Sequence, residues 1–165
     1  MPKIYDHAES VETLATRILP TYHSELATAR IGYIFVDTAS KKNGKPVLGK
    51  VRKVSGSLEF LLDKDFLVEV ALDQWNNLAD TQRLALVDHL LERCTGEEDS
   101  EEGGGEYKWK LREPDVQEFT TILRRHGAWN DELAALLSVA QQISVDARVQ
   151  EVVDAEEQTD VTTQH

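Results

Sequence analysis

The sequence is short of the features that mark disulfide-bonded, secreted and membrane-spanning proteins. It contains one cysteine, Cys94, in 165 residues, so no disulfide can form within the chain, which fits a reducing cytoplasm. No apolar run approaches the roughly 20 residues that a membrane-spanning helix needs. The first ten residues, MPKIYDHAES, lack the apolar core of a secretory signal. These absences predict a cytoplasmic protein.

Positive charge is also scarce, and the acidic excess is unevenly distributed along the chain. The net charge is −12, yet residues 1–72 contain ten Lys and Arg against nine Asp and Glu. Residues 73–113 have a net charge of −6, and residues 114–165 have −7. Such a surface repels nucleic-acid phosphates, so direct nucleic-acid binding is not expected. Two interpretations stay open, a solvated acidic surface and a surface that docks on a basic protein.

Hydrophobic periodicity predicts an α+β fold with a mixed or antiparallel sheet of about four strands. The strands are expected at 31–36, 47–54, 66–72 and 107–112. Asn43-Gly44 predicts a hairpin tip between the first two. Glu69 interrupts the apolar 66–72 run, and it is either a solvent-facing edge residue or a site carboxylate. Residues 58–62 are apolar, but their pattern assigns no structure.

About four helices are predicted to pack with this sheet. They are expected at 10–29, at 80–94, from Pro114 to Gly127 and from 131 onward. Ser10, Asp80 and Asn130 are expected to cap helix starts, Pro20 to kink or split the first helix, and Gly127 to end the third. In the second helix, one buried face is expected to consist of Leu84, Val87, Leu91 and Cys94.

Residues 95–106, TGEEDSEEGGGE, contain six carboxylates and four glycines and are expected to form a mobile loop. The acidic side chains of this loop are candidate partner-binding residues: Glu97, Glu98, Asp99, Glu101, Glu102 and Glu106. The strand that follows is expected to turn Tyr107, Trp109 and Leu111 inward. A single domain is predicted over residues 1–150, followed by a disordered acidic tail over 151–165.

Five phrases of the sequence resemble the phage metallopeptidase family. They are GYIFVD, GKVRKVSG, DFLVEVALDQW, RLALVDHLLERC and KWKLREPDVQEFTTILRRHGAW, in family order from Gly32 to Trp129. The resemblance implies a phage-encoded protein in the host cell cytoplasm. It also implies a small zincin-like α+β domain, in which one helix contains the motif D-H-E-L-C-H.

The chain departs from that motif at the positions that carry the chemistry. Asp88 and His89 match it, but Leu90 stands at the catalytic Glu, Glu92 at the Cys and Arg93 at the second His. Zinc hydrolysis needs about three protein ligands and a base that takes a proton from water. Leucine has no proton to exchange and arginine cannot bind a cation.

A further ligand is implied by a His-Asp-Val triplet that many family members have before the next helix. Here that triplet is Pro114-Asp115-Val116, so only the Asp and Val match. The resemblance therefore implies His89, Glu92 and Asp115 as the metal ligands if zinc is bound, and the competing expectation is that no cofactor is bound. His89 has three open roles: hydrogen-bonded structural residue, metal ligand and catalytic residue.

Three hypotheses about function follow from these patterns. The leading hypothesis is a zincin-like protein that has lost peptidase activity and acts by binding a host or phage protein. The second is an acidic, DNA-mimic-type inhibitor of a host DNA-handling or defence enzyme, with carboxylates in place of phosphates. The third is an active zinc-dependent peptidase with a non-standard site. None of them predicts a membrane as partner.

Overall fold

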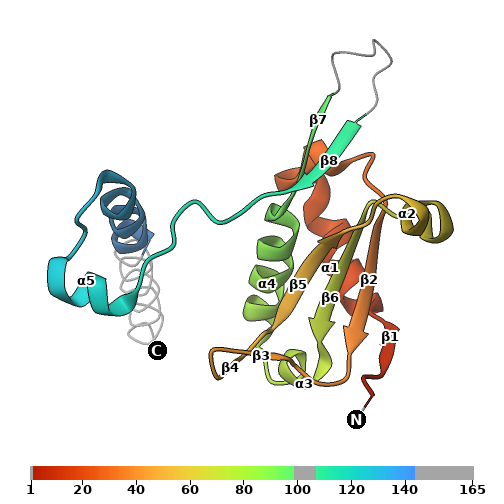
Figure 1. Ribbon diagram of the computed structural model, residues 1–165, viewed down its shortest axis with the longest axis horizontal. Helices are drawn as coiled ribbons and strands as arrows, with labels where there is room; N and C mark the ends of the chain where they lie inside the picture. Colours follow the sequence, from red (N-terminus) through yellow and green to blue (C-terminus); the bar gives the residue numbers. More distant parts are fainter. Residues whose placement is uncertain (1, 99–106, 144–165) are drawn as a thin grey trace, which may run out of the picture. The chain divides into compact units, whose positions relative to one another are not determined.

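The computed structural model describes residues 2–98 and 107–143 of the chain (Figure 1). These residues form two units, one that ends at Glu113 and one that begins at Pro114. Candidate residues Asp99, Glu101, Glu102 and Glu106 lie outside the described residues, as does the predicted tail over 151–165. The single domain expected over residues 1–150 stays a prediction. In the described part of the chain, no helix is both long and apolar enough to cross a membrane.

A mixed four-stranded sheet forms the centre of the first unit, with the strand order β1-β2-β6-β5. The two inner strands, β2 (Ile31–Val36) and β6 (Phe66–Ala71), pair in parallel. The outer strands, β1 (Tyr5–His7) and β5 (Gly49–Lys53), pair antiparallel with them. The α+β class and the mixed sheet are therefore confirmed, and the two inner strands coincide with the most β-branched and apolar runs of the sequence.

Two long helices, α1 (Glu9–Tyr22) and α4 (Asp80–Glu92), cover one face of this sheet (Figure 1). Alternate residues of the strands point to that face and form the core with apolar residues of both helices. The strand residues of this core are Tyr33, Val51, Phe66, Val68 and Val70. From the helices it includes Val11, Ala15, Ile18, Val87, Leu90 and Leu91. The face predicted for the helix at 80–94 is confirmed, since Val87, Leu91 and Cys94 are in the core and Leu84 packs against it.

Glu69 lies on the opposite face of the sheet, and it is not at a solvent-facing edge. It is only 4% exposed because β6 is an inner strand. Its Oε1 atom lies 2.9 Å from Nζ of Lys50, its direct cross-strand neighbour on β5. The edge interpretation is therefore wrong, and the buried carboxylate is compensated by an opposite charge on the adjacent strand.

The predicted helix caps are only partly correct. α1 begins after Ala8 rather than at Ser10, and it runs through Pro20 to Tyr22 before a 3₁₀ turn, η1 (Ser24–Leu26). Pro20 falls in the last turn, so its missing N–H costs a single hydrogen bond close to the end and does not split the helix. Asp80 is the first residue of α4 instead of its cap, and Gln82 Oε1 accepts the Ala79 N–H at 2.9 Å.

Short strands and helices lie in the segments that connect or follow the strands of the central sheet. The hairpin of β3 (Lys41–Lys42) and β4 (Lys45–Pro46) turns at Asn43 and Gly44, whose φ values of 52° and 78° confirm the predicted tip. The apolar residues 58–62 belong to a helix, α2 (Ser57–Leu62), and α3 (Leu72–Trp75) follows β6 directly. These helices are too short for sequence periodicity to reveal them.

The acidic segment after α4 begins as a strand, so the loop predicted from Thr95 is wrong for its first four residues. β7 (Cys94–Glu98) pairs antiparallel with β8 (Tyr107–Leu111). Two lysines on β8 offset the acidic charge of β7, and Lys110 Nζ lies 2.9 Å from Glu97 Oε2. The cross-strand charges therefore remove the repulsion that the local sequence suggests.

Tyr107, Trp109 and Leu111 alternate along β8 and so share one face, but of the three only Trp109 is partly buried. Trp109 is half-buried and packs edge-on against Phe66, with ring centroids 5.8 Å apart. Tyr107 and Leu111 are exposed. The β7–β8 pair forms its own two-stranded sheet, and Cys94 of β7 and Trp109 of β8 connect it to the core.

In the second unit, α5 (Thr120–His126) begins six residues later than the expected start at Pro114. The preceding segment is held by Glu118, whose side chain accepts hydrogen bonds from the Phe119 N–H and from Trp129 Nε1. Gly127, with φ of 64°, ends α5 as predicted. Asn130 caps the helix over 131–143, since its Oδ1 accepts the Leu133 N–H at 2.9 Å.

Candidate functional site

The position that corresponds to the catalytic Glu is part of the hydrophobic core. Leu90 is only 2% exposed and lies between α4 and strand β5. A Cβ atom at Gly49 would lie 2.8 Å from Leu90 Cδ1, so the glycine leaves the space that the leucine side chain fills. A buried leucine in contact with the sheet cannot activate a water molecule.

The position of the second His ligand is occupied by a partly buried cation. Arg93 ends α4, and its Nη2 lies 3.0 Å from Glu113 Oε1 just beyond β8. The Arg93 Nε atom is buried and has no hydrogen-bond partner. A fixed guanidinium at this position repels any metal ion that would bind beside it.

The three predicted metal ligands have different surroundings within their own units. His89 is exposed on α4, Glu92 bonds to Arg112, and Asp115 is exposed in the second unit. Among residues 2–98 and 107–143, no group of three or more His, Cys, Asp or Glu side chains is placed so that it could hold a metal ion. Leu90 and Arg93 lack the chemistry of a catalytic zinc site, and zinc at His89, Glu92 and Asp115 stays a prediction.

The structure instead brings together four residues that we call the His23 cluster: His23, Glu25, Asp88 and Glu92. His23 is 1% exposed, and its Nε2 lies 2.6 Å from Asp88 Oδ1. Its Nδ1 lies 3.7 Å from Glu92 Oε2 and 4.0 Å from Glu25 Oε1. Sequence reasoning did not find His23, because 65 residues separate it from Asp88. The only available signal was the i, i+4 spacing of Asp88 and Glu92, which places both on one side of α4.

Two other reactive groups of the core are kept neutral by burial. Burial raises the pKa of the Cys94 thiol to about 12, and the nearby Arg93 offsets only part of this rise. Burial also raises the pKa of the Tyr33 hydroxyl above its usual range. Neither group is ionised near neutral pH, so neither supplies a nucleophile or a base.

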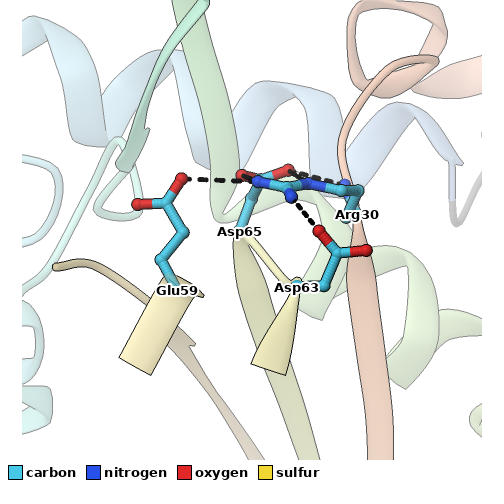
Figure 2. A network of polar contacts seen from close by, with 4 residues as sticks. All are labelled: Arg30, Glu59, Asp63 and Asp65. Carbon is cyan, nitrogen blue, oxygen red and sulfur yellow. Dashed lines mark hydrogen bonds and ion pairs between the residues drawn. The ribbon is translucent and has the colours of Figure 1, made fainter. Parts of the chain in front are cut away.

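A network around Arg30 anchors helix α2 to the sheet (Figure 2). The Arg30 guanidinium donates to both carboxylate oxygens of Asp65, with Nη2–Oδ1 at 2.7 Å and Nε–Oδ2 at 3.1 Å. It also bonds to Asp63, which follows α2, and to Glu59 within α2 at 3.3 Å. One side chain at the start of β2 thus connects α2 with the segment that leads into β6.

The Arg30 network also shifts the proton affinity of Asp65. Burial favours the neutral carboxyl, but hydrogen bonds from the Arg30 side chain and backbone outweigh it, so the pKa of Asp65 is lowered. The hydrogen bond to Asp65 raises the pKa of Arg30 in turn. Both groups are therefore charged across the physiological pH range.

The anchored helix α2 turns its large apolar side chains to solvent. Phe60 is 87% exposed and Leu61 is 73% exposed, and Leu58 and Leu62 are also exposed. Four large apolar side chains in one exposed six-residue helix form a clustered patch, unlike the scattered single residues that are normal on protein surfaces. The α2 patch, defined by these four residues, is therefore a candidate contact surface.

The first prediction concerns the carboxylate that holds this anchor. We expect Asp65→Asn to lower the free energy of unfolding at pH 7 by about 2 kcal/mol, because it weakens charge-assisted hydrogen bonds to Arg30. Since the folded pKa is lowered, this stabilisation is present above the unfolded pKa of about 3.9 and is lost as pH falls through the folded value. Urea denaturation between pH 2 and 7 should show a shallower acid dependence in the variant.

Asp63→Asn is the matched control, because Asp63 also bonds to Arg30 but its side chain is exposed. An exposed ion pair contributes about 1 kcal/mol or less, so this variant should stay close to the wild type. Equal acid dependence in Asp65→Asn and the wild type would contradict the assigned role of Asp65.

The described residues have an α+β fold, and its helix α4 has Leu90 and Arg93 at the positions where the resemblance implies a catalytic Glu and a ligand His. A sequence model of the putative phage metallopeptidase family matches residues 3–140. The chain belongs to this family. No curated protein and no solved structure matches the chain.

Proposed function

We propose that this protein is a non-catalytic member of its family that acts by binding a partner protein of the host or the phage. The observation that carries the proposal is the burial of Leu90 in the core at the position of the catalytic base. Arg93, paired with Glu113, stands at a ligand position. The helix that bears the family motif therefore contributes to stability through its packing, and function is expected on another surface.

The α2 patch supports binding of a protein. Phe60 and the leucines offer the aromatic and aliphatic anchors that supply most of the binding energy at protein interfaces. The Arg30 network holds the helix in place before binding, which reduces the entropy lost on association. The whole chain has a net charge of −12. The matching partner is therefore a basic protein with an apolar groove.

The second prediction tests this surface by capture from host lysate. Wild-type protein on beads should retain a basic partner that is released as salt increases, and Phe60→Ser/Leu61→Ser should lose it. Phe119→Ser, at another exposed aromatic residue, is the matched control and should retain it. The partner is then identified by mass spectrometry, and its direct binding is measured with purified proteins.

Capture that is equal in the wild type and the α2 variant would overturn the proposed surface. Capture that survives the α2 change but is lost in Glu97→Gln/Glu98→Gln would instead favour the acidic-mimic hypothesis. In that case the partner should be a nucleic-acid-handling enzyme, and polyanions should compete with the protein for it.

A further inference from the structure

Helices α1 and α4, which cover the same face of the sheet (Figure 1), border a groove with a volume of about 660 Å³. Four residues of α1 line it at the spacing i, i+3, i+4 and i+7, from Ser10 to Arg17, which places them along one side of that helix. The first turns of α4, beginning at Asp80, also line the groove, as does Trp75 of α3. Its volume lies within the range of about 300–1,000 Å³ that is usual for small-molecule sites.

Part of the groove is apolar and fixed by the core. Leu14 and Leu84 line it and are half-buried, so each keeps some apolar surface accessible. Trp75 is 4% exposed and packs against Phe35, with ring centroids 5.9 Å apart. A ligand with an apolar body can therefore bury surface against side chains that lose little freedom on binding.

Arg83 is oriented toward the same groove by its own contacts. Its Nε atom donates to the Trp75 carbonyl oxygen at 3.0 Å, and its guanidinium carbon lies 5.3 Å from the centroid of the Trp75 ring. Its Nη1 atom lies 3.6 Å from Asp80 Oδ1, which is too long for a hydrogen bond. The contacts that orient Arg83 thus use Nε and the face of the guanidinium, so the Nη groups can donate to a ligand.

The groove has an excess of positive charge in an acidic chain. Arg17 is exposed, and no carboxylate of residues 2–98 and 107–143 pairs with it. Glu9 and Glu12, in the first turn of α1, do not line the groove. Two arginines against one aspartate give the groove a charge of +1, whereas the whole chain has −12. This local reversal of sign favours an anionic ligand.

We propose that the groove between α1 and α4 binds a small organic anion, a molecule with a carboxylate or phosphate group and an apolar body. Arg17 and Arg83 bind the anionic group, because a guanidinium donates paired hydrogen bonds to either kind of oxyanion. The apolar body lies against Leu14 and Leu84, a surface that an inorganic anion leaves uncovered. The groove includes no residue of the α2 patch and no position of the family motif at 88–93.

The third prediction is tested by NMR titration of full-length, nitrogen-15-labelled protein with 2-naphthoate and, separately, with 2-naphthyl phosphate. We expect saturable shifts of the Trp75 indole signal and of the Thr81 and Leu84 amide signals, with a Kd of about 1 mM or lower for a ligand of this size. 2-Naphthol has the same rings but is uncharged at pH 7, so it should bind at least about 10-fold more weakly. The anion that binds more tightly identifies the preferred group as carboxylate or phosphate.

Substitutions of the charged residues should change this affinity in opposite directions. Arg17→Gln should weaken binding of both anions about 10-fold, because it removes a charged donor. Asp80→Asn should strengthen binding, because it removes the negative charge that competes with the ligand. Lys45→Gln is the matched control, since it removes an equal charge from the exposed β3–β4 hairpin and should bind as the wild type does.

Absence of saturable shifts at these three signals with both anions would overturn the inference. Equal affinity for 2-naphthol, unchanged affinity in Arg17→Gln or lost affinity in Lys45→Gln would do the same. Arg83→Gln should also weaken binding, and if that variant fails to fold, Arg17→Gln decides the question because its side chain is exposed. Partner capture by the α2 patch uses none of these residues, so its outcome is independent of this one.

Discussion

Leu90→Ala is expected to lower the free energy of unfolding by about 3–4 kcal/mol, the range for a leucine truncated in a closely packed core. Leu90 lies against Gly49, and the core around it includes Val87 and Leu91. Removing the side chain therefore leaves a cavity that the sheet cannot fill. Leu90→Glu, which restores the residue of the family motif, should be at least as harmful because it buries a carboxylate without a partner. Urea denaturation followed by circular dichroism measures both effects.

His89→Ala is the control for Leu90, since it changes the adjacent residue of α4 at an exposed position. Its effect should be within about 0.5 kcal/mol, as for most surface substitutions. If Leu90→Ala cost less than about 1 kcal/mol, a core role would be contradicted. A folded and stable Leu90→Glu variant would likewise show that the position is open to solvent.

Gly96→Ala is expected to destabilise the protein by about 1–3 kcal/mol, although alanine in place of glycine usually restricts the unfolded chain and stabilises. The added Cβ would lie 2.5 Å from Trp109 Cε3 and 3.1 Å from Tyr107 Cδ1. The Trp109 ring must then move away from Phe66 and from its stacked neighbour Tyr107. Near-ultraviolet circular dichroism should report this displacement of the indole.

A double-mutant cycle separates this clash from a general loss of strand stability. In a Trp109→Ala background, the Gly96→Ala change should cost much less, because the Trp109 ring is absent and only the looser contact with Tyr107 Cδ1 remains. The same cost in both backgrounds would contradict the assigned contact. Thr95→Ala, at the preceding position of β7, should have a small effect in either background.

Local chemistry was sufficient to predict the elements whose signals lie within a few residues. The inner strands β2 and β6 follow from their β-branched and apolar runs, and the hairpin tip from Asn43-Gly44. Gly127 and Asn130 end and begin helices as their chemistry requires. Each of these features depends on the residue itself and its immediate neighbours.

The features that sequence reasoning missed depend on residues far apart in the chain. The local sequence of β7 predicts a loop because its acidic residues repel one another. The lysines that offset this charge lie on β8, across a connection outside the described residues. Glu69 was predicted to face solvent because the sequence does not show its ion-pair partner, Lys50, which lies on another strand. His23 and Asp88 meet only after α1 and α4 pack side by side. Tertiary structure alone brings such pairs together.

The candidate site itself was only partly predictable. The sequence shows that Leu90 and Arg93 lack the chemistry of the family motif, and the structure adds that one is buried and the other is paired with Glu113. The apolar residues of α2 did not indicate a function, because the sequence of so short a segment does not show which of its residues are exposed. The exposure of the α2 patch follows from the tertiary structure, in which the Arg30 network anchors that helix (Figure 2).

The central claim, that this family member does not hydrolyse peptides, is tested most directly by a peptide-library cleavage assay. Full-length protein is incubated with zinc and a mixture of peptides of diverse sequence, and mass spectrometry detects every new terminus. His89→Ala and a reaction without protein serve as controls. We predict that the wild type yields no zinc-dependent cleavage above either control. Zinc-dependent cleavage by the wild type that disappears in His89→Ala would contradict the account and restore a catalytic role for the motif helix.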